Sequence, residues 1–97
     1  MPFRIRLRPE VETEVLEAMA WYQARASGVD RDFYRAFRDI VTSLEEAPRR
    51  YATVRGEVRR VVFRRFPYLL FYVVEGDEVV VLACVHERRG PENWPEG

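Results

Sequence analysis

The sequence predicts an α+β domain with the element order β-α-α-β-β-β, in which a helical hairpin packs on one face of a small, mainly antiparallel sheet. Two observations lead to this fold class. Apolar residues recur at helical spacing between residues 10 and 44, and three runs rich in β-branched and aromatic residues follow between residues 58 and 85. The 97 residues include no linker, repeat or low-complexity stretch. We therefore expect one domain over residues 1–97.

The N-terminal region predicts a strand followed by a helix. Residues 3–7, FRIRL, alternate apolar and basic side chains, as strands do. Pro9 can occupy the first position of a helix, and the apolar residues Val11, Val15 and Met19 continue at helical spacing. We expect this helix to span residues 9–27 and to end at Gly28.

A second helix is predicted from Asp30, which can cap its N-terminus, to Ala47, which precedes Pro48. Its apolar stripe is regular and consists of Phe33, Phe37, Ile40, Val41 and Leu44. We expect Phe37 to lie in the core. Because the connection between the helices is short, they should form an antiparallel hairpin.

The second half of the chain predicts three strands, over residues 58–65, 68–74 and 78–85. Phe66-Pro67 separates the first two, and Gly76-Asp77 separates the last two as a tight hairpin. With these turns, Val61 faces Tyr72 across the sheet and Tyr68 faces Val85.

This register distributes the side chains over two faces. The face that we expect the helices to cover carries Val62, Leu69, Phe71, Val73, Val80, Leu82 and Cys84. The opposite face carries Arg59, Val61, Phe63, Arg65, Tyr68, Leu70, Tyr72, Val79, Val81 and Val85. Since no predicted element remains to cover it, this second face is expected to be a binding surface, apolar and rimmed by arginine and tyrosine.

Charge and composition narrow the classes of function. The net charge is zero, but residues 49–74 carry seven arginines against Glu57 alone, which suits a phosphate or an acidic peptide. The single cysteine, Cys84, excludes an intramolecular disulfide and a cysteine-rich metal site, and we expect neither a metal nor a cofactor. No apolar run approaches the roughly 20 residues of a membrane span, and the N-terminus lacks a signal-peptide core. A cytoplasmic protein that does not associate with membranes is expected.

The closing stretch, ACVHERRGPENW, places the only histidine, His86, beside Arg88, Arg89 and Trp94. His86 could act as a general acid or base on a phosphodiester, Arg59, Arg65 or Arg89 could stabilise the phosphate, and Tyr68 or Tyr72 could stack on a base. The structural alternative is that Trp94 folds back over the core while the arginines are solvated. One histidine among scattered arginines indicates anion binding better than it indicates catalysis.

Residues 59–94 resemble the second half of the ParE/RelE superfamily, the toxins of type II toxin–antitoxin modules. The pieces that match are Arg65-Phe66-Pro67-Tyr68, the following Tyr72, the Gly76-Asp77 hairpin, and His86-Glu87-Arg88-Arg89-Gly90-Pro91 with Trp94. The first half also fits, because members of the family open with one strand and a helical hairpin, so the resemblance covers nearly the whole chain. The most similar branch is the ParE-like one, often labelled plasmid stabilisation proteins. The family often has aspartate where Gly90 stands. The resemblance implies one ParE/RelE-like toxin domain.

The resemblance also implies a function. ParE-like members are held to poison DNA gyrase by binding, and a cognate antitoxin neutralises them, so we expect a non-enzymatic toxin. One alternative is a RelE-like, ribosome-dependent and metal-independent mRNA endonuclease, with catalytic candidates His86, Tyr68, Arg65 and Arg89. Another is an inactive member that only binds an antitoxin. The residues expected to contact a target or an antitoxin are Arg59, Val61, Arg65, Tyr68, Tyr72, Arg88, Arg89 and Trp94.

Overall fold

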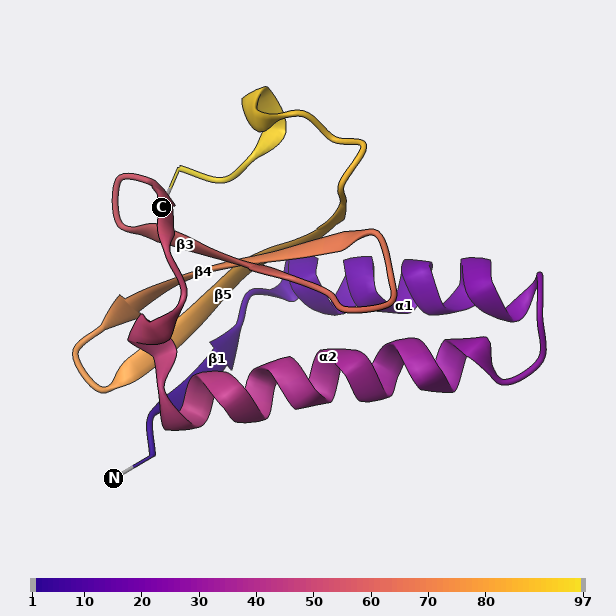
Figure 1. Ribbon diagram of the computed structural model, residues 1–97, viewed down its shortest axis with the longest axis horizontal. Helices are drawn as coiled ribbons and strands as arrows, with labels where there is room; N and C mark the ends of the chain where they lie inside the picture. The colour runs from indigo at the N-terminus through magenta and orange to yellow at the C-terminus, as the bar shows by residue number, and fades with distance from the viewer. Residues whose placement is uncertain (1, 97) are drawn as a thin grey trace.

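The computed structural model describes residues 2–96, which form two helices against a five-stranded sheet (Figure 1). The elements are β1 (Arg4–Leu7), α1 (Pro9–Gln23), α2 (Val29–Glu46), the 3-10 turn η1 (Pro48–Arg50), β2 (Thr53–Arg55), β3 (Val58–Val62), β4 (Tyr68–Glu75), β5 (Glu78–His86) and the 3-10 turn η2 (Pro91–Asn93). The strand order is β1-β5-β4-β3-β2, with β1 parallel to β5 and the other pairs antiparallel. The predicted fold class is confirmed, with β2 as an additional short strand.

The helical hairpin follows from local sequence signals, although its connection differs from the prediction. α1 begins at Pro9 as expected but ends at Gln23, four residues early. Gly28 is the residue before α2 and adopts φ +87°, a left-handed conformation that favours glycine. Asp30 was expected at the cap and instead lies in the first turn, where the helix dipole still favours its charge.

α2 supplies the helical side of the core. Phe33, Phe37, Val41 and Leu44 are all buried, which confirms the predicted stripe and the core position of Phe37. In this amphipathic helix, burial of the aromatic and aliphatic side chains is the main stabilising contribution.

The predicted assignment of the sheet faces is wrong. The face that packs on the helices carries Val61, Phe63, Leu70, Tyr72, Val79, Val81 and Cys84. Most of these residues were expected on the uncovered face. Both faces of β4 and β5 are apolar, so alternation alone could not indicate which of them the helices cover. Tyr72 tolerates burial because its hydroxyl donates a hydrogen bond to the Pro48 carbonyl.

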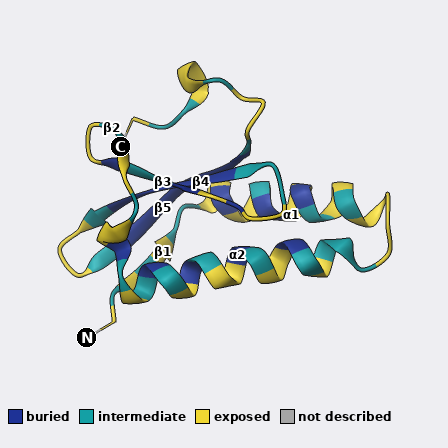
Figure 2. Cartoon of the chain, in the orientation of Figure 1, coloured by how far each residue is buried: buried dark blue, intermediate teal, exposed yellow. Residues whose placement is uncertain are grey.

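The other face is covered too, by the C-terminal segment. Its buried residues are Val58, Leu69, Phe71, Val73, Val80, Leu82, Ala83 and Val85. Trp94 packs on Phe71 with a ring-centroid distance of 5.1 Å. Arg55 ties the segment to β2 by donating hydrogen bonds to the carbonyls of Trp94, at 2.9 Å, and Pro91. In Figure 1 this segment lies across the sheet from the helices, and Figure 2 shows the strands between the two layers as the most buried part of the chain. The expectation that no element covers this face was therefore wrong.

Two departures from regular pairing set the strand register. β3 ends at Val62, three residues early, and Val61 pairs with Leu70 instead of Tyr72. In β5, the pairing Tyr72–Val81 is followed by Phe71–Ala83, so that Leu82 is an extra residue in a β-bulge. Beyond the bulge Tyr68 pairs with His86 instead of Val85.

Within residues 2–96, neither helix combines the length and apolar character that crossing a membrane would require.

Candidate functional site

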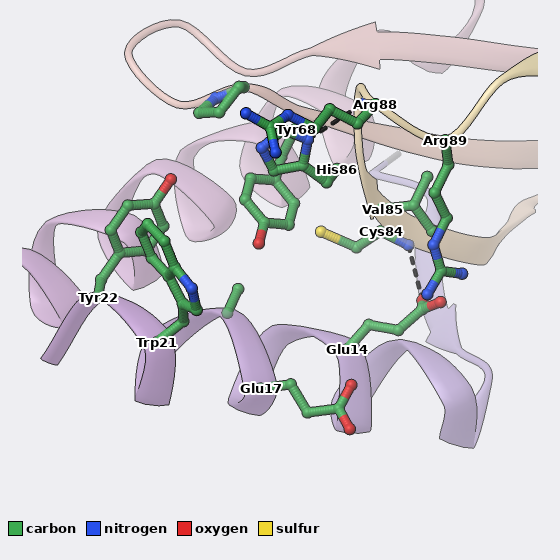
Figure 3. Close-up of a pocket in the computed structure, with 12 residues that line it drawn as sticks. Glu14, Glu17, Trp21, Tyr22, Tyr68, Cys84, Val85, His86, Arg88 and Arg89 are labelled. Carbon is green, nitrogen blue, oxygen red and sulfur yellow. Dashed lines mark hydrogen bonds between the residues drawn. The ribbon is translucent and has the colours of Figure 1, made fainter. Parts of the chain in front are cut away.

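A groove of about 550 Å³ lies between α1 and the sheet end formed by the start of β4 and the end of β5 (Figure 3). α1 contributes one wall and the segment after β5 contributes the rim. The residues that line the groove are Glu14, Glu17, Ala18, Trp21, Tyr22, Pro67, Tyr68, Cys84, Val85, His86, Arg88 and Arg89. Of the nine residues expected to bind or react, four lie in this groove, namely Tyr68, His86, Arg88 and Arg89, and the other five lie elsewhere.

An aromatic cluster holds Tyr68 in place. The Phe33 ring lies 5.0 Å from the Tyr68 ring, edge to face, and 5.2 Å from the Phe66 ring. Tyr22 of α1 contacts the same cluster, with its ring 5.1 Å from Phe66. Edge-to-face pairs of this kind are favourable beyond the area they bury. The Tyr68 side chain therefore has a defined position at the groove.

The β-bulge brings His86 next to Tyr68. Without the extra residue at Leu82, side-chain alternation would turn His86 to the opposite face of the sheet. With it, the His86 and Tyr68 rings meet edge to face, 5.2 Å apart. A single inserted residue in β5 thus creates the cross-strand pair at the centre of the site.

Backbone hydrogen bonds fix the turn that follows His86. The Glu87 N–H donates to the Pro67 carbonyl at 2.8 Å, and the Arg89 N–H donates to the His86 carbonyl at 3.0 Å. The Arg88 N–H donates to Nδ1 of His86 at 3.0 Å. Because Nδ1 accepts this hydrogen bond, the neutral ring carries its proton on Nε2. The imidazole then offers the groove a donor, not an acceptor.

Glu14 links α1 to β5. Its Oε1 accepts a hydrogen bond from the Cys84 N–H at 2.8 Å, at a point of β5 that β1 does not reach because their pairing stops at Val81. The Arg89 guanidinium points toward the Glu14 carboxylate (Figure 3). Burial raises the pKa of Glu14, while the hydrogen bond from Cys84 and the charge of Arg89 act in the opposite direction.

Two further groups in the groove keep their protons at neutral pH. Burial raises the pKa of the Tyr68 hydroxyl, which therefore remains a hydrogen-bond donor. Burial also raises the pKa of the Cys84 thiol to about 12, so this sulfur is not a nucleophile at neutral pH. Within residues 2–96 no three His, Cys, Asp or Glu side chains are grouped so that they could hold a metal ion.

Five residues predicted for the site have other positions. Val61 and Tyr72 are buried beneath the helices, with 4% and 0% of their surface exposed, and present no side chain to a partner. Arg59 is half-buried and donates to the carbonyls of Arg49 and Tyr51, which makes it a structural link between β3 and η1.

Trp94 covers the opposite face of the sheet, as the structural alternative had it, and its Nε1 donates to the Arg89 carbonyl at 3.3 Å. Arg65 is exposed and lines a second groove, beside α2.

The groove residues on α1 were not predicted from the sequence. Glu14 lies one position from the buried Val15, at the edge of the apolar stripe, where a side chain can reach both solvent and the sheet. Trp21 is half exposed and stacks under the Arg25 guanidinium, 3.6 Å from the ring centroid. In the sequence, Trp21 could have been noticed as a large aromatic residue outside the predicted apolar stripe of this helix.

The fold is shared with toxins of two toxin–antitoxin systems. The structure of a chromosomal ParDE system from P. aeruginosa superposes with a TM-score of 0.63 at 16% identity, over 87% of this chain and 95% of that one. The toxin–antitoxin complex RelBE2 from Mycobacterium tuberculosis matches with the same TM-score at 17% identity, over 89% of this chain and 99% of that one. The class is thus a RelE/ParE-like toxin fold.

Sequence comparison narrows the class. Residues 5–91 match the model of the ParE toxin of type II toxin–antitoxin systems. Toxin ParE2 of Mycobacterium tuberculosis is 30% identical over 93 residues, which cover 94% of this chain and 88% of that protein. The chain belongs to the ParE toxin family, as its resemblance to the ParE/RelE superfamily had implied.

Proposed function

We propose that this chain is a cytoplasmic toxin that arrests growth by binding its target, DNA gyrase, and that a cognate antitoxin neutralises it. The family supports a toxin of a type II module. The similar ParDE and RelBE2 structures are of toxin–antitoxin systems, which supports a protein antitoxin as the partner. The choice of binding over catalysis comes from the groove between α1 and the end of the β4–β5 sheet.

The observation that carries this proposal is that the groups beside Tyr68 and His86 are hydrogen-bond donors, while the two carboxylates of the groove, Glu14 and Glu17, lie across it on α1. Tyr68 holds its proton, and His86 presents Nε2–H because its other nitrogen accepts the Arg88 N–H. The Glu14 carboxylate already accepts the Cys84 N–H, and Glu17 points away from Tyr68 and His86 (Figure 3). General base catalysis needs an acceptor within reach of the proton that is removed. Donors and two exposed arginines, Arg88 and Arg89, suit an acidic protein surface instead.

A ribonuclease is the second candidate, and a specific observation favours it. Tyr68, His86, Arg88 and Arg89, which could together bind and activate a phosphodiester, meet in one groove of about 550 Å³. A shift of the His86–Arg88 hydrogen bond when RNA binds would free Nδ1. The third possibility, a member that only binds an antitoxin, predicts that the chain does not arrest growth at all.

Induction of variants in growing bacteria separates these functions. We expect His86→Ala to remain toxic, transcripts to stay intact, and induced cells to form filaments with damaged DNA. Arg88→Ala with Arg89→Ala should lose most of the growth arrest, whereas Arg38→Ala, at an exposed position of α2 outside both grooves, should keep it. If the chain is instead a ribonuclease, His86→Ala should abolish cleavage at ribosomal A sites and toxicity together, since such groups contribute about 10²–10⁴-fold.

A further inference from the structure

The C-terminal segment, residues 87–96, is attached to the sheet at its two ends. Figure 1 shows it, in yellow, running from the end of β5 back toward the β2–β3 hairpin. Within residues 2–96, the segment forms hydrogen bonds to Pro67 and His86 where it leaves the sheet, and to Arg55 of β2 farther on. The Arg55 guanidinium donates to two carbonyls of the segment, and its rigid fork of donors fixes both of them at once.

The Trp94 side chain joins this attachment to the backbone of Arg89. Its ring packs on Phe71 of the outer sheet face at a centroid distance of 5.1 Å, and the Arg60 guanidinium lies over it, 5.3 Å from the centroid. On the other side of the ring system, Nε1 donates to the Arg89 carbonyl at 3.3 Å. The indole therefore connects the sheet to a residue at the rim of the candidate site.

Arg88 and Arg89 are held mainly through their neighbours in the chain. Both side chains are exposed, and neither forms an ion pair in the part of the chain that the structure describes. Their backbone N–H groups donate to Nδ1 and to the carbonyl of His86, which lies in the same turn. Because such local bonds do not tie the turn to another element, its direction depends on where the chain is next attached, at Pro91 and Trp94.

We propose that Arg55 and Trp94 are positioning residues, which hold Arg88 and Arg89 at the rim of the groove between α1 and the end of β5. Neither Arg55 nor Trp94 lines that groove, so both act through the backbone of the C-terminal segment. Pro91 follows Arg89 by two positions, and so short a connection transmits the position of the anchored carbonyl to the arginines. The inference rests on the proposed function in one respect, that Arg88 and Arg89 contact the target.

Two conservative variants separate positioning from mere coverage of the sheet. Trp94→Phe keeps an aromatic ring for Phe71 but lacks the N–H that reaches the Arg89 carbonyl. Arg55→Lys keeps the positive charge of β2 but not the fork that holds two carbonyls. If the segment only covered the apolar face, both variants should act on the target as the wild type does. If it positions the arginines, both should be weaker.

The first measurement is backbone amide exchange of the full chain by NMR, which does not depend on the identity of the target. We expect Arg55→Ala to accelerate exchange of the Arg88 and Arg89 amides at least about fivefold, because the turn opens more often once the segment is released. The control is the Ala24 amide, which donates to the Ala20 carbonyl at the end of α1 and should change less than about twofold. If Arg55→Ala does not fold, Arg55→Lys takes its place.

The second measurement is inhibition of DNA supercoiling by purified gyrase. Arg55→Ala and Trp94→Phe should each weaken inhibition at least about threefold, and Arg38→Ala, on the outer side of α2, should not. In a chain that already carries Arg88→Ala and Arg89→Ala, the same two changes should have no further effect. This non-additivity is expected because a positioning residue acts only through the side chains that it positions.

Three results would overturn the inference. They are amide exchange of Arg88 and Arg89 that Arg55→Ala leaves unchanged, full inhibition by a variant in which that exchange is accelerated, and equal losses with and without the two arginines. Failure of the proposed function has a different outcome. If the wild-type chain does not inhibit gyrase at all, the target assignment is wrong, while the amide exchange still decides whether Arg55 holds the turn of Arg88 and Arg89 in place.

Discussion

The Glu14 side chain accepts a backbone hydrogen bond of β5 at a position where β1 no longer pairs with that strand. β1 ends before it can pair with Cys84, and Glu14 reaches from α1 to accept the Cys84 N–H instead. The position costs the side chain part of its hydration, which is why its pKa is raised despite the hydrogen bond. The same side chain lies opposite Arg89, so it also positions the rim of the candidate site (Figure 3).

This raised pKa predicts a pH-dependent stability. The folded chain holds the Glu14 proton more tightly than the unfolded chain does, so its stability should fall as pH rises from the ordinary value of 4.5 through the raised one, and the loss should persist above it. Glu14→Gln retains an oxygen that accepts the Cys84 N–H but does not titrate. Relative to the wild type, this variant should therefore gain stability between about pH 4 and pH 7, as measured by urea unfolding. Glu17→Gln, at an exposed position of the same helix, is the control. A Glu14→Gln difference that shrinks as pH rises would contradict this reading.

At the scale of elements, α2 contributes four buried side chains to the core and α1 contributes three. The stripe from Phe33 to Leu44 belongs to the same core cluster as residues of β3, β4 and β5, and Phe33 also packs against the Tyr68 ring. The core and the candidate site therefore share one helix. Loss of packing on α2 should disturb both.

Phe37→Ala should destabilise the chain by roughly 3–5 kcal/mol, because it removes a buried ring and leaves a cavity. That is a large fraction of the stability expected for a domain of this size. Tyr34→Ala, on the same helix but 45% exposed, should cost less than about 1 kcal/mol. Denaturant unfolding measures both, and a Phe37→Ala loss below about 1 kcal/mol would mean that α2 does not support the core.

The C-terminal segment is the element that seals the second face. Trp94→Ala should cost about 2 kcal/mol and expose the apolar surface around Phe71, which should increase the binding of a hydrophobic dye. The matched control is Trp21→Ala, because Trp21 is half exposed and lies on the helical side. If the Trp94 variant changed neither stability nor dye binding, the segment would not be a structural cover.

Most elements could be predicted from the sequence, but the faces of the sheet could not. The stripe of α2 and the Gly76 turn are local signals, and α2 and the last hairpin lie where these signals placed them, whereas α1 ends early and β2 was missed. In β4 and β5, by contrast, apolar residues occupy both faces, so period-two alternation has no polar side to mark the solvent. The bulge at Leu82 is equally hidden inside a uniform apolar run.

Only part of the candidate site could be predicted from the sequence. Tyr68, His86, Arg88 and Arg89 stand out by residue type, and the groove brings them together. The contribution of Glu14 could not be predicted, because its partner Cys84 lies 70 residues away and the contact depends on where β1 stops. Local sequence signals therefore predict helices and strands, whereas the lining of the groove depends on contacts between residues that are far apart in the sequence.

At the scale of the whole molecule, two grooves lie on different parts of one small toxin. The groove between α1 and the end of β5 presents donors, two arginines and the carboxylates of Glu14 and Glu17, and the groove beside α2 presents five arginines against two aspartates. The net charge of the chain is zero, so any electrostatic attraction of a partner depends on how the charges are distributed over the surface.

The most direct test of the central claim, that this ParE-family chain acts by binding and not by cleavage, is DNA supercoiling by purified gyrase. The wild-type chain should inhibit supercoiling in proportion to the fraction of enzyme bound. Arg88→Ala with Arg89→Ala should weaken that inhibition, and His86→Ala should leave it nearly unchanged. Supercoiling that proceeds normally at saturating toxin, while ribosome-bound messages are cut in a parallel reaction, would contradict the account.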